Sequence, residues 1–412
     1  MSSVFEPKKI IDLEQIIGDA LAQKIPLEIL GAGSKRAVGQ PMVTAQQVSL
    51  VSFSGITLYE PEELVLAARA GTPLMEIEKA LDQFGQQLAF EPVNLGNMLG
   101  SKLAQTIGGI MATNFSGPRR IQAGAARDHL LGVEMVTGRG ERIKTGGRVV
   151  KNVTGYDLCK LFVGSYGTLA VATDLTFKVL PASEKTRTIL VAVEDEETAI
   201  SAMKDSLNSP NNVSGAAFLS REISKRSKVS YVSSANASIA AIRIEGSAPS
   251  VEARCCALKK ILIVYGDIQE LHYHNSMQFW KEVGNVTPYV DKVGVVWRIS
   301  AAPTNAIEIV RKISNNLAIE FYLDWGGGLI WLRVIEKRND GGAVEIRDAI
   351  KGHGGHATLI RANEKIRSQV PVFQPQAEGV ATLSQRLKSS FDPTGILNPG
   401  RMTYSPGPEH AN

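Results

Sequence analysis

The chain has 412 residues, 44% hydrophobic and 21% charged, which is enough for about two or three domains with substantial cores. Its 45 basic residues nearly balance 41 acidic ones, and there is no interleaved basic–aromatic patch, so nucleic-acid binding is not indicated. Three cysteines exclude a disulfide framework and are too few for a [4Fe–4S] cluster, which normally takes four thiolates.

The first residues lack the charged-then-apolar pattern of a secretion signal, and no uncharged apolar run approaches the ~20 residues of a membrane span. With so few cysteines, we expect a reducing compartment. We therefore expect a cytoplasmic protein that reaches the inner face of a membrane only through partners.

The beginning of the chain predicts a small α/β unit. Apolar residues at helical spacing indicate a helix over 10–21, and short apolar runs at 27–30 and 48–53 indicate strands. A strand is expected at 63–70. A helix with Thr72 as N-cap and Pro73 as first residue should follow it and stop at Gly85. Residues 90–117 are rich in glycine and asparagine, with little periodicity.

The middle of the chain predicts a hairpin, in which residues 133–137 and 142–145 flank a Gly-Arg-Gly turn. Alternation of apolar and polar residues over 169–179 predicts a half-buried strand. After Pro181 the composition becomes polar, which indicates a linker over 182–188.

Alternating strands and helices beyond the linker predict a second domain of the α/β or α+β class. A final helix over 377–390 leads to two turns, Asp-Pro-Thr-Gly and Asn-Pro-Gly-Arg. The expected strands are 189–193, 240–245, 293–300 and 328–334, and the expected helices are 197–207, 249–264 and 306–315.

Three glycine-rich stretches could approach a ligand closely. Gly31–Ser34 can form an anion nest for a diphosphate or a plain turn, and Arg36 rules out the Rossmann fingerprint. Thr106–Gly109, with the small and polar residues that follow, can bond a ribityl chain or form a surface loop. In residues 151–171, Gly155, Gly164 and Gly167 allow either a flat ligand against the backbone or ordinary turns.

Together with the terminal segment 392–401, these stretches resemble the FAD-binding domain of the vanillyl-alcohol oxidase, or PCMH, superfamily. The phrases GPRR, RDHLLG, VVKNVTGYDLCKL, VGSYGTL and GGHATL are similar to those of the glycolate oxidase E-subunit family. The resemblance covers roughly residues 5–404. It implies an α+β fold: a two-part FAD-binding domain over 1–182, an α/β cap domain over 183–375, and a segment over 376–404 that returns to the flavin.

The resemblance also implies which residues would contact FAD. No histidine lies near the diphosphate loop, since the first is His129, so we expect noncovalent FAD. The expected FAD-binding residues are Gly31, Ala32, Gly33, Ser34, Lys35, Thr106, Ile107, Gly108, Gly109, Asn114, Ser116, Asn152, Gly155, Tyr156, Asp157, Gly164, Ser165, Gly167, Thr168, Val171, Asn398 and Arg401.

Candidate catalytic residues lie in the phrase KGHGGHATLIR. His353 or His356 could accept a hydroxyl proton and Arg361 could hold a carboxylate, but Gly352–Gly355 also suits a hairpin turn with two exposed histidines. The metal-binding histidine cluster of related catalytic subunits has no full counterpart, so we expect no metal.

The resemblance implies an FAD-binding subunit of a glycolate (2-hydroxy acid) dehydrogenase complex. It would act with a sister FAD subunit and an iron–sulfur subunit that carries the electrons away. Two alternatives stay open: a stand-alone flavin-dependent alcohol or hydroxy acid oxidoreductase, and a non-catalytic structural subunit.

Overall fold

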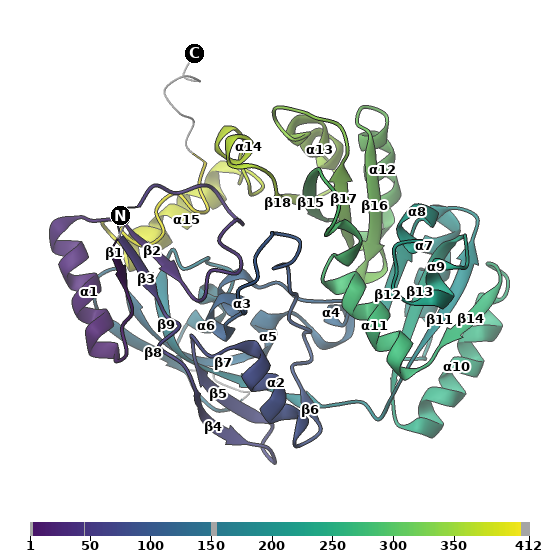
Figure 1. Ribbon diagram of the computed structural model, residues 1–412, viewed down its shortest axis with the longest axis horizontal. Helices are drawn as coiled ribbons and strands as arrows, with labels where there is room; N and C mark the ends of the chain where they lie inside the picture. The colour runs from purple at the N-terminus through teal and green to yellow at the C-terminus, as the bar shows by residue number, and fades with distance from the viewer. Residues whose placement is uncertain (1–2, 45, 150–154, 405–412) are drawn as a thin grey trace. The chain divides into compact units, whose positions relative to one another are not determined.

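The computed structural model describes residues 3–44, 46–149 and 155–404, and the chain divides into two compact units (Figure 1). Unit 1 comprises Met1–Phe115, Gly124–Ala182 and Pro375–Asn412. Unit 2 comprises Ser116–Ala123 and Ser183–Gln374. Residues 116–123, which we expected in the first domain, therefore belong with the second.

Unit 1 contains two main sheets. A three-stranded parallel sheet has the order β1-β3-β2, and a five-stranded antiparallel sheet has the order β4-β5-β9-β7-β8. The strands are β1 (Ser3–Phe5), β2 (Leu27–Leu30), β3 (Gln46–Ser49), β4 (Ile56–Glu60), β5 (Val65–Arg69), β6 (Gln86–Gln87), β7 (Leu130–Thr137), β8 (Arg142–Gly146), β9 (Ala170–Lys178) and β10 (Leu180–Pro181). The helices are α1 (Ile10–Gln23), α2 (Leu74–Asp82), α3 (Ile107–Thr113), α5 (Ala126–His129), α6 (Leu158–Phe162) and α15 (Glu378–Phe391).

The predicted hairpin and half-buried strand are confirmed as β7–β8 and β9. The predicted cap of α2 is wrong: Pro73 is the N-cap, while the fully buried Thr72 donates its hydroxyl hydrogen to Arg69 O at 2.7 Å and accepts a bond from Gly55 N. Sequence reasoning also missed α3, because its glycines suppress helix propensity.

A β-bridge and a cluster of hydrogen bonds hold the C-terminal segment in unit 1. Leu27 of β2 forms a parallel bridge with Leu397, and the Asp392 carboxylate accepts bonds from two backbone amides of the Ile396–Leu397 turn. Lys388 of α15 pairs with Asp392 and donates to Thr168 O at 2.6 Å. These bonds satisfy groups that would otherwise be buried without partners.

Unit 2 is built on one eight-stranded sheet with the order β14-β11-β13-β12-β16-β17-β15-β18. Every neighbouring pair is antiparallel, so the domain is α+β, not the α/β cap that the resemblance implied. Its strands are β11 (Lys185–Val193), β12 (Gly215–Leu219), β13 (Ser238–Gly246), β14 (Ile268–Leu271), β15 (Val295–Ser300), β16 (Ile319–Asp324), β17 (Leu329–Val334) and β18 (His356–Arg361).

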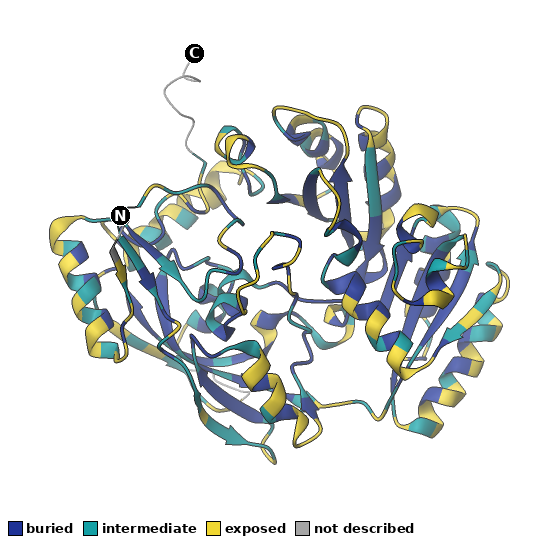
Figure 2. Ribbon diagram, viewed as in Figure 1, coloured by how far each residue is buried: buried dark blue, intermediate teal, exposed yellow. Residues whose placement is uncertain are grey.

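Strand periodicity decides which residues enter the core of unit 2. Ile189, Val191 and Val193 of β11 alternate along the strand and belong to one buried cluster that also contains residues of α7, α10, α12 and α13 (Figure 2). The helices are α4 (Arg120–Ala123), α7 (Glu196–Leu207), α8 (Arg221–Ser224), α9 (Ser230–Ser233), α10 (Ala248–Leu262), α11 (Tyr273–Gly284), α12 (Ala306–Ser314), α13 (Ala343–Ile350) and α14 (Glu364–Gln369), with short 3-10 turns η1 (Thr287–Tyr289), η2 (Pro303–Asn305) and η3 (Trp325–Gly327).

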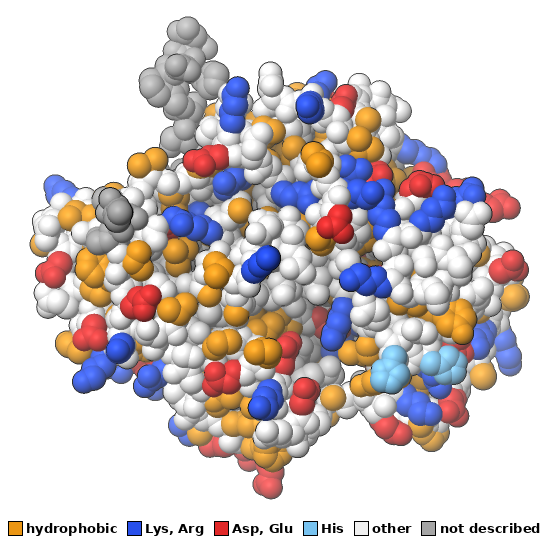
Figure 3. Space-filling view, viewed as in Figure 1, with side chains coloured by type: hydrophobic (Ala, Val, Ile, Leu, Met, Phe, Trp, Pro, Cys, Tyr) orange, Lys and Arg blue, Asp and Glu red, His pale blue; other side chains and the backbone are white. Residues whose placement is uncertain are grey.

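Charge is spread thinly over the surface. On the face shown in Figure 3, basic and acidic side chains are interspersed among polar and apolar ones. This pattern agrees with the near balance of 45 basic and 41 acidic residues.

Candidate functional site

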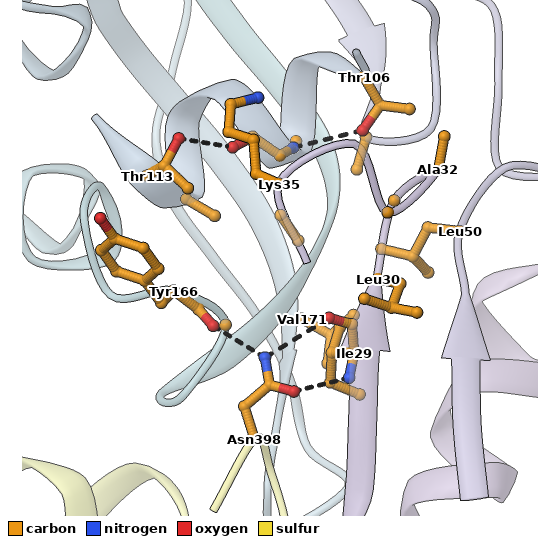
Figure 4. Close-up of a pocket in the computed structure, with 18 of the residues that line it drawn as sticks. Ile29, Leu30, Ala32, Lys35, Leu50, Thr106, Thr113, Tyr166, Val171 and Asn398 are labelled. Carbon is orange, nitrogen blue, oxygen red and sulfur yellow. Dashed lines mark hydrogen bonds between the residues drawn. The ribbon is translucent and has the colours of Figure 1, made fainter. Parts of the chain in front are cut away.

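A cavity of about 770 Å³, counted with its open mouth, lies in unit 1. Four segments distant in sequence form its wall, as the close-up in Figure 4 illustrates: residues 29–36 after β2, the helix α3, residues 162–172, and the C-terminal pair Asn398 and Arg401.

The loop after β2 is shaped by one close contact and one ion pair. A Cβ on Gly31 would lie 2.1 Å from the Thr106 hydroxyl oxygen, so only glycine lets this loop approach α3. Gly33 has φ +83°, which favours glycine. Arg36 forms a bidentate ion pair with the buried Glu28 at 2.8 and 2.5 Å, so its guanidinium holds the loop in place.

The helix α3 begins at the cavity and packs tightly against β5. Thr106 is its N-cap and accepts a bond from Gly109 N at 3.4 Å. A Cβ on Gly108 would lie 2.8 Å from Ala70, so this glycine allows close packing between the two elements. Thr113 donates its hydroxyl hydrogen to Gly109 O at 2.9 Å. The helix is thereby fixed despite two glycines in its first turn.

Asn398 links three segments at the base of the cavity (Figure 4). Its Oδ1 accepts from Ile29 N at 2.7 Å, and its Nδ2 donates to Tyr166 O at 2.8 Å and to Ile29 O at 3.5 Å. A Cβ on Gly167 would lie 2.8 Å from that Nδ2, so Gly167 makes room for Asn398. Arg401 donates to Arg36 O at 2.9 Å and thus connects the C-terminal turn to the loop after β2.

The structure brings many of the expected FAD-binding residues together, but not all of them. Ile107 is fully buried in the core, and Asn114 is the left-handed C-cap of α3, where its Oδ1 accepts from Arg127 N. The expected residues that line the cavity are Gly31, Ala32, Gly33, Ser34, Lys35, Thr106, Gly108, Gly109, Gly167, Val171, Asn398 and Arg401. Gly164, Ser165 and Thr168 belong to the neighbouring turn and are not among the lining residues.

Several lining residues escaped sequence reasoning. Leu50, Ala70 and Phe162 are ordinary apolar residues whose role depends on tertiary contacts, so no local pattern marks them. Ala170 and Ala172 of β9 carry a usable signal, because small residues inside a strand leave space on its face.

Gly155, Tyr156 and Asp157 lie elsewhere. They line a second cavity of unit 1, next to Lys160 and Lys178. Asn152 lies outside the described residues, and Ser116 belongs to unit 2. Gly155, Tyr156, Asp157 and Ser116 are therefore not among the residues that line the first cavity.

Within unit 2, the two adjacent arginines of the GPRR phrase have different roles. Arg119 is buried and forms a bidentate ion pair with Glu245 at 3.0 and 2.7 Å, beside Arg243. Burial alone would raise the pKa of Glu245, but Arg243 and then Arg119 outweigh it and hold that pKa at about 2. Arg119 therefore anchors the 116–123 segment to the sheet.

Arg120 instead stacks on Trp325 in a cationic cluster of unit 2. Its guanidinium carbon lies 4.3 Å from the indole centroid, and that of Arg298 lies 5.0 Å from the same ring. The indole is held in place because its Nε1 donates to Gly117 O at 3.0 Å. His356 completes this cluster, since burial lowers its pKa and the charges of Arg298 and Arg120 lower it further.

The other two expected catalytic residues lie outside this cluster. Arg361 donates to the backbone carbonyls of Tyr289, Lys292 and Gly294. Its guanidinium group therefore stabilises the loop over residues 289–294. His353 pairs with Lys312 of α12 at 2.9 Å. The turn Gly352–Gly355 connects the helix α13 to the strand β18. It is therefore not the hairpin turn that the sequence suggested.

Comparison with known proteins identifies the family. Residues 1–146 match the family model described as FAD binding domain. The chain is 34% identical to glycolate oxidase subunit GlcE of Escherichia coli over 95% of its own length and 96% of that relative's. The chain belongs to the glycolate oxidase GlcE family. Members of the wider group include glycolate oxidase subunit GlcD of Bacillus subtilis, which is 24% identical over 97% of the chain and 88% of the relative.

Solved structures agree with the fold of the GlcE family member. p-Cresol methylhydroxylase superimposes with a TM-score of 0.72 at 15% identity, covering 98% of this chain and 88% of that one. Alkyldihydroxyacetonephosphate synthase superimposes with a TM-score of 0.69 at 16% identity, covering 96% of this chain and 75% of that one. The expected two-domain α+β architecture of PCMH-type flavoproteins is thereby confirmed.

FAD is the cofactor of this family member, and the first cavity fits it. The wall combines an apolar lining with a glycine-rich loop and a buried lysine, Lys35, and it contains no acidic side chain that would repel a diphosphate. Gly31–Lys35 would hold the diphosphate, and α3 with residues 167–171 would contact the flavin and its linker. Among the described residues, no three potential metal ligands lie together, and no helix has the length and apolarity to cross a bilayer.

Proposed function

We propose that this chain is the FAD-binding subunit of a complex that oxidises glycolate, or a related 2-hydroxy acid, to the 2-oxo acid. The observation that carries this proposal is the glycine-lined cavity in unit 1, in a chain that matches glycolate oxidase subunit GlcE over nearly its whole length. D-Lactate dehydrogenase of Archaeoglobus fulgidus, 25% identical over 97% of the chain, is a relative named for another 2-hydroxy acid.

The cationic cluster of unit 2 supports a role in substrate recognition. Arg120 and Arg298 can hold a carboxylate by charge-assisted hydrogen bonds, and the indole of Trp325 keeps both guanidinium groups in place. His356, whose pKa is lowered by burial and then by the charges of the same arginines, can accept the hydroxyl proton of the 2-hydroxy acid. Bound FAD would supply the two-electron acceptor for this oxidation.

Electrons would leave through partners, because the described residues contain no group of three potential metal ligands that could carry them onward. Cys159 and Cys255 are buried thiols whose pKa values burial raises to about 11, and Cys256 is exposed beside Cys255 on α10. We propose a sister FAD subunit and an iron–sulfur subunit as partners. The complex would lie in the cytoplasm, at the inner face of the membrane through those partners, and its FAD would be noncovalent because no histidine lines the cavity.

Anaerobic reduction of the purified chain tests this function. The chain alone, loaded with FAD, and the co-purified complex are each mixed with glycolate without oxygen, and flavin absorbance is followed. Bleaching in both samples means that this chain oxidises glycolate itself. Bleaching only in the complex, with more than one flavin per complex, assigns the chemistry to a sister subunit. No bleaching in either sample would refute the glycolate assignment.

Two further outcomes discriminate the alternatives. Rapid reoxidation of the isolated chain by oxygen, with full turnover and no partner, would indicate a stand-alone oxidase. Failure of the purified chain to take up FAD would indicate a structural subunit. The intact wall of the cavity argues against the second outcome, since its glycines and Asn398 form one bonded network.

A further inference from the structure

Lys35 is a buried cation in the wall of the FAD cavity. It ends the loop Gly31–Lys35 and is 9% exposed. Figure 4 shows its amine at the end of the cavity where Thr106 and Thr113 lie, away from Asn398. Lys35 is one of the residues that line this cavity.

No protein anion compensates this amine in the described part of the chain. The nearest acidic side chain in sequence is Glu28, and both of its carboxylate oxygens already accept hydrogen bonds from Arg36. The other ionisable side chains along the wall are Arg36, Arg401 and Tyr166, and none of them is an acid that could pair with a lysine. Desolvation without a partner lowers the pKa of Lys35 from 10.5 to about 8.

A buried and unpaired ammonium group is unfavourable unless an anion arrives with the ligand. The diphosphate of FAD carries two negative charges, whereas the isoalloxazine and ribityl parts are uncharged in the oxidised cofactor. We propose that Lys35 is the counter-charge of the FAD diphosphate, and that FAD binding is therefore coupled to proton uptake by this amine. The proposal depends on FAD being the cofactor and not on which substrate the complex oxidises.

The coupling has a definite sign and size. In the empty cavity an amine of pKa about 8 is about nine-tenths protonated at pH 7 and about one-quarter protonated at pH 8.5. A neighbouring diphosphate favours the charged form, so the bound state is fully protonated at both pH values. Binding should then take up roughly 0.1 proton at pH 7 and roughly three-quarters of a proton at pH 8.5. FAD affinity consequently falls as the pH rises through 8.

Titration calorimetry on the full-length chain, stripped of flavin, tests the coupling. FAD is titrated at pH 7 and pH 8.5 in buffers of different ionisation enthalpy, which gives the number of protons taken up. Lys35→Arg should bind FAD at both pH values without the extra uptake at pH 8.5, because a guanidinium group stays charged. Lys35→Met should lose the uptake and bind FAD about 10- to 100-fold more weakly, which is typical of a lost charge-assisted bond.

Riboflavin, which has no phosphate, locates the contact. If Lys35 pairs with the diphosphate, Lys35→Met weakens FAD binding much more than riboflavin binding. An equal loss for both ligands would place the amine at the flavin ring and overturn the proposal, as would unchanged proton uptake in Lys35→Met. Lys102→Met is the control, because Lys102 is exposed in the same unit, and thermal unfolding of the flavin-free variants confirms that each one folds.

Discussion

Asn398 bonds both backbone groups of Ile29, although the two residues are 369 positions apart. The same side-chain amide donates to Tyr166 O at 2.8 Å, so one buried residue sets the positions of β2, the 164–168 turn and the C-terminal turn. Its backbone has φ +42°, a conformation that asparagine tolerates better than most residues. The base of the FAD cavity is therefore defined by a contact that only the folded chain makes.

Replacing Asn398 should destabilise unit 1 and weaken FAD binding together. Asn398→Ala leaves Ile29 N and Tyr166 O without partners in a buried site, so we expect a loss of about 2–4 kcal/mol in the free energy of unfolding. Denaturant unfolding followed by flavin fluorescence measures it. Asn316→Ala is the control, since Asn316 is exposed and bonds only Lys312 O, and a loss as large in the control would contradict the role of Asn398.

The contact between Gly31 and Thr106 predicts non-additive substitutions. Gly31→Ala forces a methyl group to within 2.1 Å of the Thr106 hydroxyl, so the loop must move and FAD should bind at least about tenfold more weakly. Thr106→Ala removes that oxygen, and the double variant should recover part of the lost affinity. Equilibrium titration with FAD measures all three variants. Additive losses would mean that Gly31 is needed for the ligand and not for Thr106.

The Arg119–Glu245–Arg243 cluster predicts an acid-sensitive unit 2. The pKa of Glu245 is lowered from 4.5 to about 2, so its contribution is fully present above pH 4.5 and is lost as the pH falls through about 2. A shift of this size corresponds to about 3 kcal/mol. All four tryptophans lie in unit 2, so tryptophan fluorescence during denaturant unfolding between pH 7 and pH 3 measures it.

Glu245→Gln should flatten this pH dependence and destabilise unit 2 at pH 7, because two buried arginines lose their counter-charge. Glu252→Gln serves as the control, since Glu252 is exposed and pairs weakly with Lys185 at 3.4 Å. A pH profile of Glu245→Gln that matches the wild type would contradict this account.

The cationic cluster predicts a shifted histidine titration. Burial lowers the pKa of His356, and Arg298 contributes through its charge, so Arg298→Met should raise that pKa toward 6.5. The chain has only six histidines, which makes an NMR titration of the imidazole protons practicable, with His356→Gln to assign the signal. Arg311→Met, an exposed substitution on α12, should leave the titration of His356 unchanged. If His356 titrated at the same pH in the wild type and in Arg298→Met, the charge of Arg298 would not influence the pKa of His356.

The same arginine predicts a substrate effect in the assembled complex. If the cluster holds the substrate carboxylate, Arg298→Met should raise KM for glycolate about 10- to 100-fold, as expected for a lost charge-assisted bond. Arg361→Met should instead lower thermal stability with little change in KM, because Arg361 donates to the backbone carbonyls of Tyr289, Lys292 and Gly294. Steady-state kinetics with an artificial electron acceptor compares them. A raised KM in Arg361→Met with an unchanged KM in Arg298→Met would instead indicate that Arg361 binds the substrate carboxylate.

Periodicity alone was sufficient for several of the longer helices and strands. The helices at 10–21, 197–207 and 306–315 and the strands at 240–245 and 328–334 are confirmed to within a few residues, because burial of one face imposes a period on the sequence. The failures came where tertiary contacts override local preference. Helix α3 forms through Gly108 and Gly109 because the packing of α3 against Ala70 requires the absence of a Cβ.

The lining of the FAD cavity was also predicted only in part. The family resemblance named Gly31–Lys35, Asn398 and Arg401 as FAD-binding residues, and the structure places all of them in the lining of one cavity. That Gly31 makes room for Thr106 and Gly167 for Asn398 could be read only from the fold, since these partners are distant in sequence. Folding also decided that Arg119 and Arg120 diverge, because neighbouring side chains point to different environments and only their contacts reveal which one is buried.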